Sequence, residues 1–269
     1  GGPPPKPTIN AGAFDLERTP PIPNLVMSPI DRARLKTQLH HSIAALGSQA
    51  AVLPTAEPQL KRPINGQVQA LIAQNPTSFP LSPQNYSLLW GTWDLIYASQ
   101  GTVVTRRLGQ VQDVDSSAST APVTLGRIWQ VLSPLDVAET DRRERVDADR
   151  LFPVLRAENG AILQVPVLGE VKLCARGEWT VASPGVSLGA AGPETHGPSN
   201  PNTQATVTFH SFGLQGQAVG PLWWRGPELW LPVLPLLRRS ALWRVVYCDA
   251  DLYIGEGKTG NQFVFQRSA

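Results

Sequence analysis

From residue 88 to residue 267 the chain consists largely of short segments in which apolar side chains recur at every second position. This pattern constrains the fold more than any other feature of the sequence. In "LWGTWDLIYAS", Trp93, Leu95 and Tyr97 occupy alternate positions. Alternation with a period of two is typical of a β-strand that buries one of its faces. The segment therefore predicts a strand that directs these three side chains to one side of a sheet.

Further strand candidates follow along the rest of the chain. Most of them have no helix-length spacer between them, which argues against βαβ units and favours an antiparallel barrel. The segments 136–150 and 183–201 are expected to be a solvated connection and a long loop. The predicted strands cover residues 102–108, 123–131, 150–156, 161–167, 170–175, 205–212, 241–248, 251–256 and 261–267.

Two helices are expected before the first strand. Ser28 can cap a helix with Pro29 in its first turn, and Gly47 can end it. A second helix is predicted from about Ile64 to Gln74, because apolar residues follow a helical spacing there and Pro76 stops the pattern.

The N-terminal residues 1–27 are rich in proline and are expected to form an extended arm rather than a helix. The predicted fold class is therefore mainly β. We expect an antiparallel β-barrel at 88–267, two N-terminal helices within 28–75 and a Pro-rich N-terminal arm, with residues 28–269 forming one domain.

The charge balance argues against nucleic acid as a partner. The chain has 23 Lys and Arg against 21 Asp and Glu, a net charge of +2, and these charges are interspersed rather than gathered on a basic face. Cys174 and Cys248 lie in apolar, strand-like segments. They are expected to be buried free thiols, with a disulfide or a reactive thiol as the alternatives.

Neither a membrane-spanning helix nor a secretory signal is expected. A spanning helix needs a run of about 18 apolar residues, and the chain contains none. The N-terminal "GGPPPKPTIN" lacks the charged and apolar regions of a signal peptide.

The stretch "GEGKTG" resembles the end of a phosphate-binding loop, but its context contradicts that interpretation. Such a loop requires a glycine at position 252, where the chain has Leu252. It also requires a following helix, whereas Phe263, Val264 and Phe265 lie in an alternating, strand-like segment. The stretch around Lys258 is therefore predicted to be the turn of a β-hairpin.

The remaining polar residues show no arrangement typical of catalysis or metal binding. The four histidines lack metal-ligand spacing with cysteines or carboxylates, and we find no nucleophile signature. Asp249 and Asp251 are expected to cap a turn or pair with an arginine, with contact to a ligand headgroup as the alternative. The sequence thus predicts a protein that is not an enzyme and has no metal.

Aromatic residues are the remaining functional candidates. Several occupy strand positions of one parity, and a small barrel uses inward aromatic side chains either to fill its interior or to wall an apolar cavity. Both alternatives stay open. The candidates for the barrel interior and its ligand site are Trp93, Tyr97, Trp129, Phe209, Trp243, Tyr247, Phe263 and Phe265.

The segment "PLWWRGPELWLPVLPLL" at 221–237 is apolar but shows no strand periodicity. Amphipathic aromatic side chains favour membrane interfaces, and exposed apolar patches mark interaction surfaces. Trp223, Trp224 and Trp230 are therefore predicted to form a lip that faces a membrane or a partner, with burial under one end of the barrel as the alternative.

Two blocks of the sequence resemble the plastid lipid-associated protein (PAP)/fibrillin family. The first is "LIAQNPTSFPLSPQNYSLLWGTWDLIYAS" at 71–99, with Leu89, Gly91, Trp93, Leu95, Tyr97 and Ser99 at the matching positions. The second is "LWRVVYCDADLYIGEGKTGNQFVFQR" at 242–267, with matches at Tyr247, Asp249, Asp251, Leu252, Ile254, Gly257, Gly260, Phe263 and Val264. Between the two blocks the similarity is loose.

The resemblance implies a lipocalin-like barrel and a non-catalytic function. Members of the family hold or organise lipophilic molecules such as prenylquinones, carotenoids or lipids, at thylakoids or plastid lipid bodies. We therefore expect a bound lipid, quinone or carotenoid, no other cofactor, and attachment to the cytoplasmic or stromal side of thylakoid membranes in a cyanobacterium or plastid. The alternative function is a scaffold or assembly subunit that docks on a photosynthetic protein complex without a ligand.

The resemblance also leads to expectations for individual residues. In lipocalins a late arginine packs across the tryptophan of the Gly-x-Trp motif, and Arg267 and Arg244 are the candidates for this contact with Trp93. Tyr253 and Glu256 stand where family members commonly carry arginines, so any role of those arginines is lost or reassigned here.

Overall fold

The computed structural model describes residues 2, 29–55, 57–102, 105, 123–135, 151–166, 169–182, 202–216, 226–234 and 240–269. Apart from Gly2, the predicted arm at 1–27 lies outside the described residues. So do Trp223 and Trp224 of the predicted lip, and the segments 136–150 and 183–201.

Both predicted helices are present. Helix α1 spans Pro29–Leu46 and helix α3 spans Arg62–Ile72, and α3 buries its apolar stripe of Ile64, Val68 and Leu71. Three short elements accompany them: α2 (Ser48–Val52), the 3-10 helix η1 (Pro58–Lys61) and α4 (Tyr86–Leu89).

The rest of the described chain is one antiparallel sheet of nine strands. Three predictions of strand boundaries are wrong: 150–156 and 161–167 are parts of a single long strand, the strand expected at 170–175 continues to residue 182, and the lip segment contains the short strand β6. Of the strand predicted at 102–108, only residues 102 and 105 are described, and neither lies in a strand. The strands are β1 (Gly91–Ala98), β2 (Thr124–Ser133), β3 (Leu151–Val165), β4 (Gly169–Ala182), β5 (Gln204–Gly216), β6 (Leu229–Pro232), β7 (Ser240–Cys248), β8 (Leu252–Gly257) and β9 (Gln262–Arg267).

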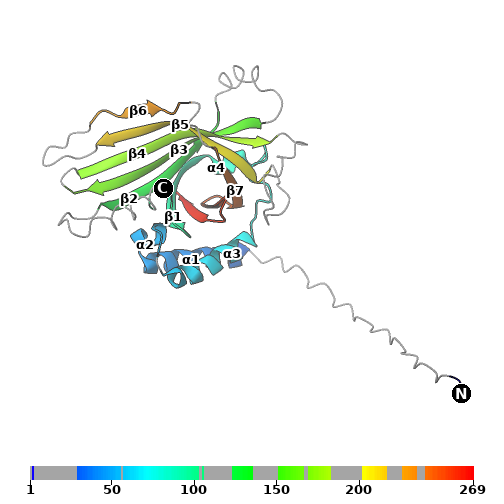
Figure 1. Ribbon diagram of the computed structural model, residues 1–269. Helices are drawn as coiled ribbons and strands as arrows, with labels where there is room; N and C mark the ends of the chain where they lie inside the picture. The colour runs from blue at the N-terminus through cyan, green and yellow to red at the C-terminus, as the bar shows by residue number, and fades with distance from the viewer. Residues whose placement is uncertain are drawn as a thin grey trace.

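The sheet closes into a ring in one half only. Strand β4, at one end of the strand order, pairs with β3 and also with β5, which is next to last at the other end, and this second pairing closes the ring. Strand β5 then pairs with β7 along Gln204–Thr208 and with β6 along Ser211–Leu214. One half of the sheet is therefore a closed ring, and the other is an open extension of β2 to β6 (Figure 1). We call these the closed half and the open half.

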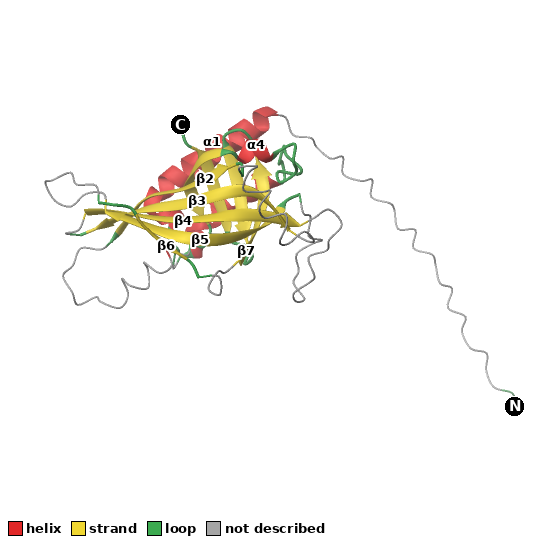
Figure 2. Ribbon diagram, turned by 90° about the horizontal axis from the view of Figure 1, so that it is seen from above, coloured by secondary structure: helices red, strands yellow, loops and turns green. Residues whose placement is uncertain are grey.

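Helices α1, α2 and α3 lie along one side of the sheet (Figure 1 and Figure 2). This arrangement creates two apolar layers, one inside the ring and one between the helices and the outer side of the strands. The second layer combines helix residues such as Leu39 and Val68 with Ile254 of β8 and Val264 of β9. Because Tyr253 and Phe265 belong to the inner layer, β8 and β9 are covered on both faces.

A buried lysine fixes the helical segment to the sheet. The Lys61 ammonium is 2% exposed and donates to three carbonyl oxygens, those of Ala51 at 3.1 Å, Leu53 at 2.7 Å and Ala98 at 2.7 Å. Burial lowers the pKa of Lys61 to about 8. All three donors are used within the protein, so Lys61 is a structural residue rather than a binding group.

Candidate functional site

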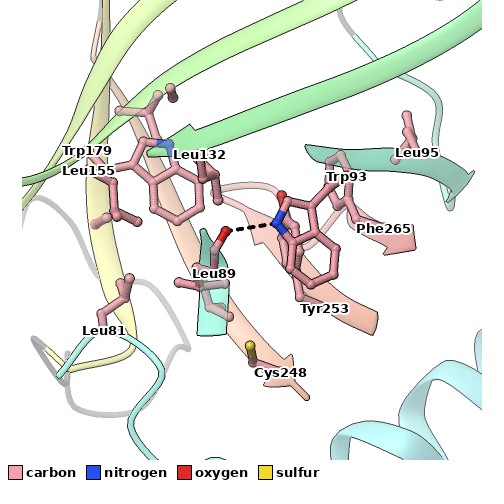
Figure 3. Packing of buried hydrophobic residues seen from close by; sticks show 14 of the residues in the cluster. Leu81, Leu89, Trp93, Leu95, Leu132, Leu155, Trp179, Cys248, Tyr253 and Phe265 are labelled. Atoms are coloured by element: carbon pink, nitrogen blue, oxygen red, sulfur yellow. Dashed lines mark hydrogen bonds between the residues drawn. The ribbon is translucent and has the colours of Figure 1, made fainter. Parts of the chain in front are cut away.

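Aromatic side chains around Trp93 fill the interior of the closed half (Figure 3). The Trp93 ring meets Tyr253 edge-on with centroids 5.0 Å apart, and Tyr253 stacks on Phe265 at 4.5 Å. The Trp93 indole N–H donates to the Leu89 carbonyl oxygen at 2.8 Å. Trp93 and Tyr253 are fully buried. The interior positions predicted for Trp93 and Phe265 are therefore correct, and here they serve packing.

A second aromatic group continues this core. Trp243 lies 5.0 Å from Phe263 and 6.2 Å from Trp179 between ring centroids. The interior positions predicted for Trp243 and Phe263 are correct, but Trp179 was not predicted because the expected strand ended at residue 175. In the described parts of the chain, the indole N–H groups of Trp179 and Trp243 have no hydrogen-bond acceptor.

The interior positions predicted for Tyr97 and Tyr247 are wrong. The pairing register shifts between Leu95 and Tyr97 in β1 and between Val245 and Tyr247 in β7. An extra residue in one strand moves every following side chain to the opposite face. Both tyrosines therefore lie in the layer beneath the helices, where the Tyr97 hydroxyl donates to Asn65 Oδ1 at 2.7 Å.

The interior position predicted for Trp129 is also wrong. Its neighbour Gln130 points inward instead and accepts a hydrogen bond from the Tyr253 hydroxyl. Trp129 lies on the outer face, where its ring covers Gly160 so closely that a Cβ atom there would stand 2.2 Å from it. Because Gly160 has no side chain, the Trp129 indole can lie flat on the sheet. This explains why Trp129 can face outward while the polar Gln130 faces inward.

Phe209 packs against the core at the border between the two halves. The register of β5 shifts after Phe209, so Phe209 and Phe212 share the inner face with centroids 6.4 Å apart. The predicted interior position of Phe209 is therefore correct, and the inner apolar surface continues past it into the open half.

The inner face of the open half exposes large apolar side chains. Residues directly opposite each other in an antiparallel pair share a face. The pairings therefore place one row on the inner face: Ile128, Ala161, Leu173, Leu214 and Leu229.

Phe212 and Leu231 form a second pair beside this row. We call the exposed part of this surface the apolar face: Phe212 (51% exposed), Leu214 (48%), Leu229 (56%) and Leu231 (59%). The row leads from Ala161, which is 4% exposed, to Leu229 at the sheet edge. The apolar face is thus a continuation of the core that the described residues leave uncovered.

The outer face of the open half is covered by its own side chains. Trp129 and Trp230 lie over Gly160 and Gly213, on either side of the buried Cys174. The Arg176 guanidinium carbon lies 3.6 Å from the centroid of the Trp230 ring. Trp230 therefore covers the sheet rather than projecting as a lip. The contrast between the two faces makes the inner one the candidate binding surface.

Both cysteines are buried free thiols, as predicted. Burial raises the pKa of Cys174, and it raises the pKa of Cys248 to about 12. Thiols with raised pKa values are poor nucleophiles at neutral pH, so neither is a candidate for chemistry.

The arginine expected across Trp93 is Arg267. Its guanidinium carbon lies 4.1 Å from the Trp93 ring centroid, and its nitrogens donate to the carbonyl oxygens of Trp90 at 2.6 Å and Leu88 at 2.7 Å. Gly91 makes room for it, since a Cβ atom there would stand 2.7 Å from Arg267 Nη1. Arg267 therefore closes this end of the ring.

The acidic pair caps a turn and binds a lysine rather than an arginine. Asp249 Oδ1 accepts the backbone N–H groups of Asp251 at 3.2 Å and Leu252 at 2.9 Å. Its Oδ2 lies 3.0 Å from Lys36 Nζ of α1, and Lys36 also contacts Asp251. Burial raises the pKa of Asp249, but hydrogen bonds with Asp251, Tyr247 and Lys36 outweigh it and lower that pKa to about 2. The cluster fastens α1 to the sheet.

Tyr253 and Glu256 also have structural roles. Tyr253 fills the ring interior between Trp93 and Phe265, and burial raises its pKa well above its usual value. Glu256 accepts a hydrogen bond from Arg244 Nη2 at 2.8 Å. The hairpin predicted around Lys258 is present, with β8 and β9 antiparallel and Gly260 at φ 74° in the turn.

A pocket of about 360 Å³ lies between helices α1 and α2 and strands β1 and β2. It is a candidate site that the sequence did not predict, because its walls come from four separate elements. Its lining residues are His40, Ile43, Ala44, Ser48, Val52, Asp94, Leu95, Ile96, Gly126, Arg127 and Ile128.

In the described part of the chain, no helix has the length and apolar character needed to cross a membrane. Comparison of the chain with protein-family models, with curated proteins and with solved structures finds no match.

Proposed function

We propose that the protein is a non-catalytic binding protein for lipophilic molecules, built as a lipocalin-like barrel of which one half is open. The observation that carries the proposal is the apolar face of Phe212, Leu214, Leu229 and Leu231, each of them about half exposed and continuous with the core. Large exposed apolar patches on soluble domains mark binding surfaces. The resemblance to the PAP/fibrillin family supports a lipid, prenylquinone or carotenoid as the bound molecule.

The energy available on this face fits a lipophile. Burying one large apolar side chain completely contributes about 1.5–3 kcal/mol. The exposed half of each of the four side chains would therefore contribute roughly 1 kcal/mol, or about 4 kcal/mol in total. Since an ordered ligand loses entropy on binding, this face alone supports weak and reversible binding.

The same face supports a proposed attachment to a membrane surface. From the resemblance, we propose the thylakoid membrane, on its cytoplasmic or stromal side. A patch of Leu and Phe side chains can enter the apolar part of a bilayer without a spanning segment. Thylakoid-membrane lipids are therefore the proposed partners.

Replacing Leu229 and Leu231 by Asp tests this proposal. Both side chains are exposed, so the double variant should fold, yet it places two charges on the apolar face. We expect it to lose binding to vesicles of thylakoid galactolipids in a flotation assay, and to contain less organic-soluble material after purification.

Leu60→Asp is the matched control. Leu60 is 51% exposed in η1, which is not part of the apolar face. Binding by wild type and control but not by the double variant supports the proposal. A wild-type protein that binds no vesicles and carries no extractable lipophile contradicts it.

A second candidate function is a scaffold or assembly subunit that docks on a photosynthetic membrane complex. The filled interior around Trp93, Tyr253 and Phe265 favours it, because these side chains occupy the space that a ligand deep in the closed half would need. Co-purification of such a complex with delipidated protein, abolished by the same double variant, would favour docking over lipid binding.

A further inference from the structure

The pocket beneath α1 and α2 exists because two neighbouring strands separate. Strands β1 and β2 pair only from Gly91 opposite Leu132 to Asp94 opposite Trp129. Beyond this point β2 contains an irregularity between Leu125 and Ile128. The two strands therefore diverge and leave a gap in the wall of the sheet.

The helices cover this gap without filling it. The side-chain amide of Gln49, in the first turn of α2, donates to the Leu125 carbonyl oxygen. A side chain therefore satisfies a backbone carbonyl at the edge of β2 where β1 no longer pairs. A buried or half-buried strand edge needs such a partner. The remaining space is the pocket of about 360 Å³, within the size range of sites for small molecules.

The floor of the pocket is apolar. Val52 is 6% exposed and Leu95 is 8% exposed, and both belong to the inner core of the ring. Ile128 packs against the same core and also begins the row that leads to Leu229 on the apolar face. The floor is thus in contact with the inner apolar layer.

The rim of the pocket offers hydrogen bonds without a net charge. Arg127 Nε donates to Asp94 Oδ1, so the two charges on the rim cancel. Burial lowers the pKa of His40, which keeps its imidazole neutral at neutral pH with one donor and one acceptor nitrogen. Ser48 adds a hydroxyl group. An added carboxylate would meet Asp94, whereas a hydroxyl or ester carbonyl group would find donors and acceptors.

We propose that this pocket binds the head of an uncharged, single-chain amphiphile, with its hydroxyl or carbonyl groups at His40, Ser48 and Arg127 and its chain on Leu95 and Ile128. The inference rests on the proposed function and deepens it by naming the ligand class and a second binding site. It assigns the head to the helix side of the sheet, away from the apolar face.

Ala44→Phe tests the pocket directly, because Ala44 lines the pocket on an exposed position of α1. A phenyl ring there fits the helix and occupies the space. Ala45→Phe is the matched control, since Ala45 is exposed on the same helix but does not line the pocket. The probe is monodecanoylglycerol, with decanoate as the charged counterpart, and the readout is calorimetric titration.

We expect Ala44→Phe to weaken binding of monodecanoylglycerol at least tenfold, while Ala45→Phe leaves it unchanged. His40→Leu should weaken it about fivefold, and wild type should prefer monodecanoylglycerol to decanoate. Equal affinities of Ala44→Phe and Ala45→Phe overturn the inference, as does preference for decanoate.

The Leu229→Asp/Leu231→Asp variant separates this inference from the proposed function. If that variant abolishes vesicle binding while Ala44→Phe has no effect on monodecanoylglycerol, the proposed function stands and the pocket proposal falls. If wild type binds neither vesicles nor monodecanoylglycerol, both fall.

Discussion

Arg267 offers the most exacting test of the structure, because one guanidinium group joins three parts of the chain. It donates to the carbonyl oxygens of Leu88 and Trp90 before β1 and of Ala250 in the β7–β8 turn, and it stacks on Trp93. This geometry needs the planar guanidinium group of arginine, since the ammonium group of a lysine cannot reach three carbonyl oxygens and also cover the Trp93 ring.

The expected loss of stability follows from these contacts. The two more exposed hydrogen bonds contribute roughly 0.5–1 kcal/mol each, and the part-buried bond to Leu88 contributes about 1.5 kcal/mol. The cation–π contact adds about 1 kcal/mol. Arg267→Leu should therefore lower the free energy of unfolding by about 4 kcal/mol, and Arg267→Lys by about 2 kcal/mol because the charge remains.

Urea unfolding followed by tryptophan fluorescence measures both losses, provided that the slope of the transition is unchanged. Arg244 supplies the matched control, as it is the other late arginine and makes a part-buried pair with Glu256. Arg244→Lys should cost about 0.5 kcal/mol. If Arg267→Lys and Arg244→Lys lower the free energy of unfolding by equally small amounts, the assignment of Arg267 as the residue that closes the ring is refuted.

Three further predictions concern other contacts. Burial raises the pKa of all four tyrosines, Tyr86, Tyr97, Tyr247 and Tyr253. Phenolate absorbance should therefore appear only on unfolding, and the free energy of unfolding should fall as the pH rises above about 10. Phenolate formation by the folded protein near pH 10 would contradict the burial of these side chains. The pKa of Asp249 is lowered to about 2, so its stabilising contribution is complete above about pH 4 and is lost as the pH falls toward 2. Asp249→Asn should therefore reduce, by about 2 kcal/mol, the free energy of unfolding that the protein loses between about pH 4 and pH 2. An unchanged loss argues against the pairing of Asp249 with Lys36. Gly160→Ala should destabilise the protein by about 1–3 kcal/mol by displacing Trp129. Gly66→Ala, in a helix with open space around it, should instead stabilise it by about 0.5–1 kcal/mol; similar effects of the two changes in thermal unfolding would refute the outward position of Trp129.

The sequence by itself determined the local structure of this protein. Alternating side chains predicted the strands from β1 to β9 except β6, although β3 was expected as two strands. Caps and helical spacing predicted α1 and α3 but not the short α2, η1 and α4. The glycines around Lys258 predicted the β8–β9 hairpin. These features depend on the backbone preferences of residues that are adjacent in the sequence. The resemblance added the contact between Arg267 and Trp93.

Only the tertiary structure decided which side of the sheet each residue faces. Tyr97 and Tyr247 moved to the helix side because bulges precede them, and a bulge is set by pairing with another strand rather than by its own sequence. Gln130 could take the inner position beside Trp129 because Tyr253, more than a hundred residues away, donates to it.

The two candidate sites also depend on long-range pairing. The apolar face arises because β5 pairs with β7 in its first half and with β6 in its second half. Leu229 and Leu231 of β6 therefore lie in the open half of the sheet. The pocket arises because β1 and β2 separate beyond Asp94 and Trp129. The sequence indicates which segments become strands. The partner of each strand at each position depends instead on packing across the whole domain. That packing decides which apolar side chains are buried and which remain exposed as a binding surface.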